Sequence, residues 1–175
     1  MRAFFGLSPD TKVKDEIATW RNTEFPDLAA PVAADNFHVT LAFIGQITSH
    51  QVNQLTALID VMPRHNTFDV ALNQQGYWAK PKAFWLGCQK TSPEHLRLVN
   101  NIKLIAEQAG LSLQEQPYIA HLTLSRKCKE PPSAGIVAAN FKWRAEQFHL
   151  FESISSQNGV QYIIRHSWPL YNMPV

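Results

Sequence analysis

The segment Phe37-His38-Val39-Thr40-Leu41-Ala42 decides the fold, because its pattern returns about half a chain length later as Ala120-His121-Leu122-Thr123-Leu124-Ser125. Each copy reads histidine, apolar residue, threonine, leucine. Side chains alternate across a β-strand, so a histidine and a threonine two positions apart share one face, and the residues on either side of the threonine share the other. The repeat therefore predicts two equivalent strands, each with one buried face and one face that carries an imidazole and a hydroxyl.

If an approximate two-fold places these strands side by side, their polar faces open into one cleft. That cleft would hold the side chains of His38, Thr40, His121 and Thr123, and the opposite faces would bury Val39, Leu41, Leu122 and Leu124. Two histidines can divide the roles of acid and base, since unperturbed imidazole titrates near pH 6.5. Threonine hydroxyls can donate to oxygens on which negative charge develops. A phosphodiester suits this set, because in-line displacement places the attacking and leaving oxygens on opposite sides of phosphorus.

A zinc site is the main alternative for the two histidines. Zinc takes three or four ligands, yet neither motif has a third ligand at a suitable spacing and no His-Glu-x-x-His occurs. The seven glycines form no phosphate-binding loop or dinucleotide fingerprint. We therefore predict no metal and no cofactor. The remaining histidines are expected at the surface or hydrogen-bonded in the core: His50, His65, His95, His149 and His166.

The composition predicts one globular domain over residues 1–175. Hydrophobic residues make up 45% of the 175 residues, enough for a core, and no apolar run approaches the ~20 residues of a membrane-spanning helix. Cys88 and Cys128 show no Cys-x-x-Cys spacing, and free thiols fit the cytoplasm. The net charge of +2 favours a short anionic ligand or an RNA end over a long duplex. Nothing in the sequence demands an oligomer, so a monomer is expected.

The periodicity predicts strands separated by three helices. We expect strands over residues 4–7, 37–44, 68–72, 83–88, 118–125, 148–151 and 160–164. Helix starts are expected at Ser8-Pro9, Thr48-Ser49 and Ser92-Pro93, each with a hydroxyl cap. Gly45 should end the second strand, Gly110 the third helix, and Asn158-Gly159 should join the last two strands. This order favours an α+β fold with largely antiparallel sheets.

The doubled motif resembles the signature of the two-histidine (2H) phosphoesterase superfamily. The flanking segments 2–7, 31–38, 43–45 and 84–87 resemble bacterial RNA 2',3'-cyclic phosphodiesterases, which are also called 2'-5' RNA ligases. This resemblance runs from about residue 2 to about residue 170. It implies a bilobal pseudo-two-fold fold, in which antiparallel sheets line a central cleft, helices lie outside, and each lobe contributes one motif, at 38–41 and 121–124.

The resemblance also implies the reaction and the roles. The enzyme would hydrolyse the 2',3'-cyclic phosphate end of RNA, such as a tRNA half, or a small cyclic nucleotide, to a 2'-phosphomonoester. ATP-independent 2'-5' ligation is implied as a second activity. By motif position, His38 would donate a proton to the leaving oxygen and His121 would accept one from water. Thr40, Thr123 and Arg126 would bind the phosphate.

Some positions carry weaker expectations. Ala120 stands where the family often has proline, which leaves the catalytic atoms in place but alters the entry to the strand. By strand parity Arg126 faces away from His121, so its role requires a twist or the end of the strand. Candidates to stack on a terminal base are Phe43, Trp78 and Tyr118, and Lys80 and Lys82 could meet the RNA backbone.

Two other functions stay open at this level. The first is a 2H enzyme that acts on another nucleotide diester, such as 2'-5' oligoadenylate, a cyclic dinucleotide or ADP-ribose cyclic phosphate. The second is a non-catalytic module that binds cyclic-phosphate RNA ends without turnover.

Overall fold

The structure is a computed structural model that describes residues 1–113, 116–157 and 159–172. Its helices are α1 (Thr11–Glu24), α2 (Ser49–Asp60) and α3 (Pro93–Gln108), with a short 3-10 turn, η1 (Ala34–Asn36). Its strands are β1 (Arg2–Leu7), β2 (Val39–Gln46), β3 (Phe68–Leu72), β4 (Gln74–Trp78), β5 (Ala83–Gly87), β6 (His121–Ser125), β7 (Phe141–Ala145), β8 (Gln147–Ser156) and β9 (Gly159–Pro169). The predicted α+β class is confirmed.

Seven of these strands form one sheet in the order β4-β5-β6-β2-β1-β8-β9, and each neighbouring pair is antiparallel. The two motif strands, β2 and β6, are therefore neighbours, as the sequence repeat predicts. They share one ladder pair, Val39 with Leu122, whereas β1 and β2 share six. The two motif strands are thus joined by a much shorter stretch of backbone pairing than β1 and β2.

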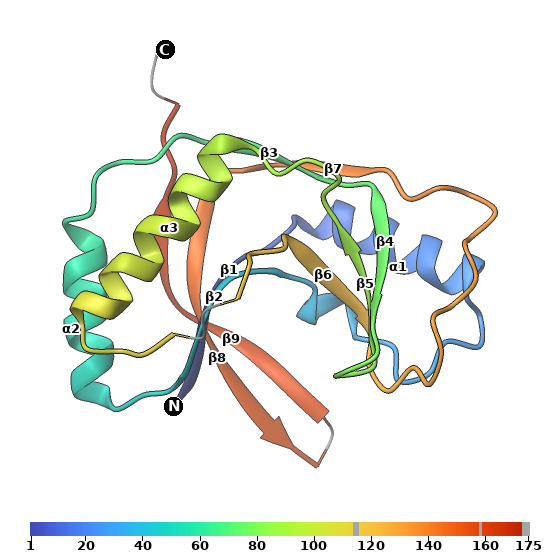
Figure 1. Cartoon of the computed structure of the whole chain (residues 1–175), viewed down its shortest axis with the longest axis horizontal. Helices are drawn as coiled ribbons and strands as arrows, with labels where there is room; N and C mark the ends of the chain where they lie inside the picture. Colours follow the sequence, from blue (N-terminus) through green and yellow to red (C-terminus); the bar gives the residue numbers. More distant parts are fainter. Residues whose placement is uncertain (114–115, 158, 173–175) are drawn as a thin grey trace.

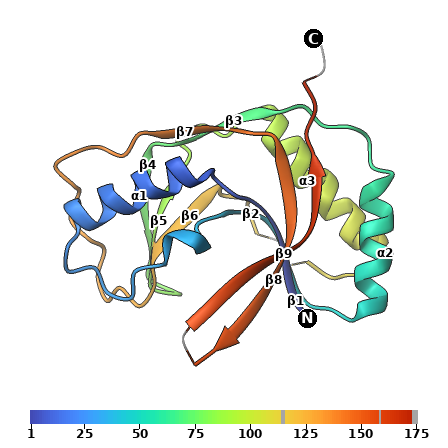
Figure 2. The same cartoon turned by 180° about the vertical axis from the view of Figure 1, so that it is seen from behind.

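The helices cover the outside of this sheet. Figures 1 and 2 show α2 and α3 together at one end of the molecule and α1 at the other, beyond β4 to β6. Each helix turns an apolar stripe inward; α3, for example, buries Leu98, Ile102 and Ala106 completely. The β8–β9 hairpin projects away from the body in both views.

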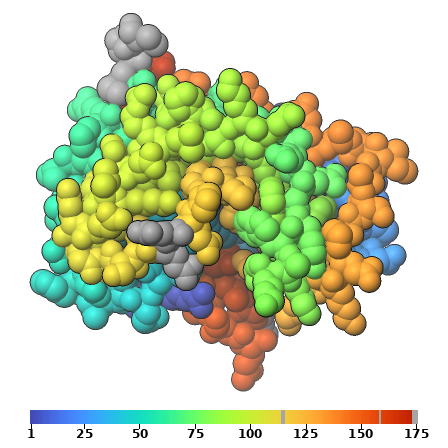
Figure 3. Space-filling model, in the orientation of Figure 1, coloured from blue at the N-terminus to red at the C-terminus, as the bar shows by residue number. Residues whose placement is uncertain are grey.

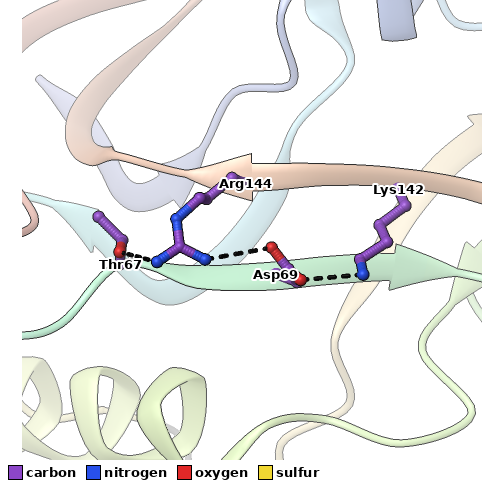
Figure 4. A network of polar contacts seen from close by, with 4 residues as sticks. All are labelled: Thr67, Asp69, Lys142 and Arg144. Atoms are coloured by element: carbon purple, nitrogen blue, oxygen red, sulfur yellow. Dashed lines mark hydrogen bonds and ion pairs between the residues drawn. The ribbon is translucent and has the colours of Figure 1, made fainter. Parts of the chain in front are cut away.

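Strands β3 and β7 form a separate two-stranded sheet. Across it Asp69 accepts from Lys142 Nζ at 2.9 Å and from Arg144 Nη1 at 3.5 Å, while Arg144 Nη2 donates to Thr67 Oγ1 at 2.6 Å (Figure 4). Lys142 and Arg144 lower the pKa of the Asp69 carboxyl. Because these side chains are exposed, the network adds little stability and serves mainly to fix register.

The first helix begins later than predicted. Ser8 does not cap it: its hydroxyl donates to the carbonyl of Pro9 at 3.3 Å. The carboxylate of Asp10 accepts from the Val13 N–H at 2.8 Å, so Asp10 is the cap and the helix starts at Thr11. Aspartate and serine are about equally good caps, so the prediction erred in the position of the cap and not in its type. The caps predicted at Thr48 and Ser92 are confirmed.

Strand bounds were predicted less well. The strand predicted over residues 37–44 was wrong at both ends. Strand β2 begins at Val39 and runs through Gly45, which is held at φ +84°, to Gln46. Residues 118–120 lie outside β6. Strands β8 and β9 are longer than predicted, and Asn158 of their expected turn lies outside the described residues. Strands β4 and β7 were missed, although β7 alternates between more buried and exposed positions.

Candidate active site

The register of β2 and β6 sets the geometry of the four motif side chains. Since Val39 pairs with Leu122 in an antiparallel ladder, Thr40 lies opposite His121 and His38 lies opposite Thr123. The two imidazoles thus occupy a diagonal, for which Cβ atoms are typically about 7–8 Å apart. One sheet face therefore holds both histidines, close enough for a charge on His121 to lower the pKa of His38.

The predicted alternation is confirmed. Val39, Leu122 and Leu124 are completely buried and Leu41 nearly so, whereas all four of the histidine and threonine side chains are half-buried on the opposite face. The apolar face fixes the strands in the core. The polar face is consequently left for a ligand.

Both imidazoles are held by the same local bond. His38 Nδ1 lies 2.7 Å from the carbonyl oxygen of Asn36, and His121 Nδ1 lies 2.8 Å from that of Ile119. In each case the acceptor stands two residues before the histidine. A carbonyl only accepts, so Nδ1 carries a proton in both rings. Each Nε2 is therefore the atom free to exchange a proton with a ligand.

Aromatic rings fix the planes of the two imidazoles. The centroid of His38 lies 4.6 Å from that of Phe4 and 4.7 Å from that of Tyr162. The centroid of His121 lies 4.5 Å from that of Trp78 and 6.0 Å from that of Trp85. Each imidazole thus packs between two aromatic rings, and this packing restricts its rotation.

The indole of Trp85 lies over two glycines. Gly76 pairs with Trp85 across β4 and β5, and a Cβ at position 76 would fall 2.0 Å from the indole ring. A Cβ at Gly87 would fall 2.6 Å from it. Only residues without a side chain let the ring lie flat here. Its Nε1 is buried and has no hydrogen-bond partner among the residues that the structure describes. On the other side of β5, Trp85 pairs with Thr123 of β6, so it lies beside the second motif.

Burial controls the charge of both imidazoles. Desolvation lowers the pKa of His38 to about 4, opposed by its bond to Asn36 and reinforced by the positive charge of Arg126. Desolvation also lowers the pKa of His121, and Arg126 again adds to the effect. Both rings are consequently neutral at pH 7 without a ligand. Because the charge of Arg126 lowers the pKa of both histidines, its guanidinium lies near both imidazoles.

Two adjoining cavities flank the motif strands. The cavity on the His38 side has a volume of about 350 Å³ and includes Arg2, Arg126 and Tyr162. The cavity on the His121 side, about 430 Å³, includes Trp78, Lys103 and Tyr118. Thr40 and Phe43 line both cavities, so the two cavities adjoin at these residues, and we refer to them together as the cleft. Figure 3 shows this face of the molecule hollowed beside the green segment of β4 and β5. Thr123 lies on the same sheet face but lines neither cavity.

Arg126 reaches the cleft because the strand stops before it. Strand β6 ends at Ser125, so strand parity no longer constrains the next residue. The Arg126 side chain donates to the Tyr162 hydroxyl at 3.2 Å and lines the His38 cavity. The structure thus brings His38, Thr40, His121 and Arg126 to one cleft. Tyr162, Phe4 and Trp85 were not predicted as site residues, since only the strand pairing reveals their position.

The three predicted stacking residues occupy different positions. Phe43 is 49% exposed and Trp78 half-buried, and both rings line the cleft. Tyr118 is fixed by its hydroxyl, which donates to the Thr40 carbonyl at 3.1 Å and lies 2.8 Å from His95 Nε2. Phe43 and Trp78 therefore remain available to a base, whereas Tyr118 ties the entry of β6 to β2.

The other predicted roles of histidine and cysteine fit the structure. His65, His95 and His149 are buried with polar partners Asn101, Tyr118 and Ser167 respectively. His50 and His166 are exposed, and both cysteines are free thiols. Within residues 1–113, 116–157 and 159–172, no group of three or more histidine, cysteine or acidic side chains is placed to hold a metal ion. None of the helices in this described part has the length and apolar content needed to cross a bilayer.

Comparison with known proteins agrees with this geometry. Residues 7–85 match the family model of LigT-like phosphoesterases. The chain is 29% identical over 170 residues to the RNA 2',3'-cyclic phosphodiesterase of Escherichia coli strain K12, covering 97% of this chain and 96% of that one. Over these comparisons the chain resembles the LigT-like phosphoesterases.

Solved structures extend this likeness to the whole fold. A crystal structure described as a phosphoesterase superposes with a TM-score of 0.89 at 28% identity, covering 97% of both chains. Escherichia coli LigT complexed with 3'-AMP superposes with a TM-score of 0.87 at 27% identity, again over 97% of both chains. The predicted 2H phosphoesterase fold, with three helices and a large antiparallel sheet, is confirmed by this match.

Proposed function

We propose that this chain is an RNA 2',3'-cyclic phosphodiesterase that forms 2'-phosphomonoesters. One observation carries the proposal: two histidines with equivalent Nδ1–carbonyl bonds lie diagonally on one sheet face, each with Nε2 available to the same cleft. In-line attack on phosphorus needs a proton acceptor on one side and a proton donor on the other. The activity named for the Escherichia coli relative fits this arrangement.

The proposed reaction uses each imidazole once. The neutral Nε2 of His121 accepts a proton from water as the water oxygen bonds to phosphorus. The bond from phosphorus to O3' breaks, and the protonated Nε2 of His38 gives its proton to O3'. The product is a 2'-phosphomonoester with a free 3'-hydroxyl. Exchange with solvent then restores both protonation states.

The proton donor must gain its proton when the substrate binds. The pKa of free His38 is about 4, so the ring is neutral at pH 7. A phosphate anion about 4 Å away contributes roughly 4 kcal/mol at an effective dielectric of 20, which corresponds to about three pKa units. The bound diester thus brings the pKa of His38 near neutrality. Substrate binding itself charges the acid.

Thr40 and Arg126 would bind the non-bridging oxygens. Thr40 lies opposite His121 and lines both cavities, so its hydroxyl can donate to the phosphate between the imidazoles. Arg126 supplies a cation beside both rings and would pair with the phosphate charge. Thr123 is the second proposed hydroxyl donor, from the polar face of β6.

We further propose that the halves of the sheet are pseudo-symmetric lobes of one domain, each with one motif. Each motif strand borders a strand that carries an aromatic residue and, two positions later, a glycine: Phe4 with Gly6, and Trp85 with Gly87. We also propose that the enzyme acts as a monomer on RNA ends, tRNA halves among them, in the cytoplasm.

Product analysis tests the function. An oligoribonucleotide with a 2',3'-cyclic phosphate end is incubated with the protein, and the position of the phosphate is read by 31P NMR. We expect the 2'-phosphate alone, with full activity in the presence of a chelator. A 3'-phosphate product would reverse the assignment of the leaving oxygen, and no product from cyclic-phosphate substrates would refute the function.

A further inference from the structure

Two lysine-rich segments lie together at one end of the cleft. Antiparallel pairing of β5 with β6, with Phe84 opposite Ser125, places the residues before β5 beside those after β6. The Cys128 N–H donates to the carbonyl of Lys82 at 3.0 Å, and the Tyr77 hydroxyl donates to the carbonyl of Cys128 at 2.8 Å. These bonds fix both segments to the sheet. We name the set of Lys80, Lys82, Lys127 and Lys129 the lysine ridge.

The charges of the lysine ridge are not neutralised within the described chain. All four side chains are exposed. The ion pairs of the described residues involve Lys12, Lys142, Arg144 and Arg165, none of which belongs to the ridge. Four exposed lysines on two adjoining segments, with no ion pair to a described carboxylate, favour a polyanion as ligand.

The lysine ridge continues directly from the cleft. Arg126, which lines the His38 cavity, immediately precedes Lys127. In the proposed reaction O3' leaves toward His38, so the terminal ribose lies in the His38 cavity. The rest of an RNA strand extends from the 5' side of that ribose. Its next phosphates can therefore pass Arg126 and reach the ridge.

We propose that the lysine ridge binds the phosphodiester backbone of RNA upstream of the cyclic phosphate end. This inference rests on the proposed function and makes an oligoribonucleotide, rather than a cyclic mononucleotide, the preferred substrate. Lysine acts on phosphates as a compact point charge without reading bases. The ridge consequently selects for chain length and tolerates any sequence.

Steady-state kinetics on two substrates test the inference. One substrate is adenosine 2',3'-cyclic phosphate, and the other is an oligoribonucleotide of about ten residues, within the usual range of single-strand sites, with the same terminal group. The variant Lys127→Gln/Lys129→Gln is compared with Lys12→Gln/Lys90→Gln. The control removes the same charge from α1 and from beyond the opposite end of β5.

The wild type should prefer the oligonucleotide. The ridge variant should lower kcat/KM on the oligonucleotide about tenfold more than on the mononucleotide near 0.1 M salt, and reduce the slope of log kcat/KM against log salt by about 1.4, since each single-strand phosphate contact contributes about 0.7. The control should change neither substrate. Equal losses on both substrates, or none, would overturn the ridge while leaving the function intact. Failure to hydrolyse either substrate would refute the proposed function and the ridge with it.

Discussion

Gly76 lies directly opposite Trp85 across β4 and β5, and the indole ring occupies the space that a Cβ at position 76 would need. The relationship matters for catalysis because the same indole packs beside His121. A methyl group added at Gly76 would therefore act on His121 through the tryptophan.

We predict that Gly76→Ala moves the indole and lowers activity. Overpacking of this kind costs about 1–3 kcal/mol of stability, and a shift of about 1 Å at a catalytic group can cost about 10²-fold in rate. Thermal unfolding and kcat on a cyclic mononucleotide measure the two effects. In a Trp85→Leu background the same change should cost much less, because the clash is gone. Additive losses would contradict the packing explanation.

Removal of either imidazole should abolish most activity. We predict that His38→Ala and His121→Ala each lower kcat by about 10²–10⁴-fold, the usual value of one acid or base. The fold should persist, since both side chains sit on the polar face of their strands. His50→Ala, on the exposed surface of α2, serves as the control. Circular dichroism establishes folding, and near-normal hydrolysis by either cleft variant would disprove the assigned roles.

The pH dependence of kcat/KM should show an acidic optimum. The active form needs His38 protonated and His121 neutral, and kcat/KM reports the free enzyme. Since the pKa of free His38 is about 4 and that of His121 lies below its ordinary value, kcat/KM should fall about tenfold per pH unit above pH 6.5. The alkaline limb of kcat should lie at higher pH, because bound phosphate raises the pKa of His38. Coincident limbs would count against charging of the acid by substrate.

Stability should decrease as the solution is acidified from pH 6.5 toward 4. Burial lowers the pKa of both His95 and His149 to about 4. Above pH 6.5 these rings are neutral in the folded and unfolded states, so they add no pH dependence. Below it the unfolded chain binds protons that the native chain refuses, which costs up to about 1.4 kcal/mol per pH unit for each ring. Urea unfolding at pH 7, 6 and 5 measures the slope, and His149→Gln should reduce it. A free energy of unfolding that does not change between pH 7 and 5 would contradict the lowered pKa values of His95 and His149.

Arg21 should matter to activity although it lies outside the cleft. The residue is 6% exposed, and its guanidinium donates to the carbonyls of Val32 and Leu124 and lies 5.3 Å from the centre of the Phe37 ring. Arg21 therefore ties the residue before His38 to the strand of His121. We predict that Arg21→Lys, which lacks the planar fork, lowers kcat more than it raises KM. Lys12→Arg, on the exposed face of α1, is the matched control. An unchanged kcat at intact stability would exclude this positioning role.

Much of the site could be predicted because its chemistry is repeated in the sequence. The two motifs gave the strand faces, the burial of Val39 and Leu122 and the adjacency of the histidines. Tyr162, Phe4 and Trp85 could not be predicted as neighbours of the imidazoles, since their contacts depend on the pairing of strands distant in sequence. Strand β4 was missed because Gln74, Gln75 and Gly76 lack apolar alternation, and its glycine is explained only by a ring from β5.

The single ladder pair between β2 and β6 has a mechanical consequence. The proposed acid, His38, and the proposed base, His121, belong to opposite sides of a seam. One backbone pair, the Arg21 guanidinium and the Tyr118 hydroxyl bridge this seam. A small rotation about this seam would change the spacing of the imidazoles without unfolding either side. In the proposed mechanism the seam therefore sets the precision of proton transfer, and substitutions there should lower the rate before they lower the free energy of unfolding.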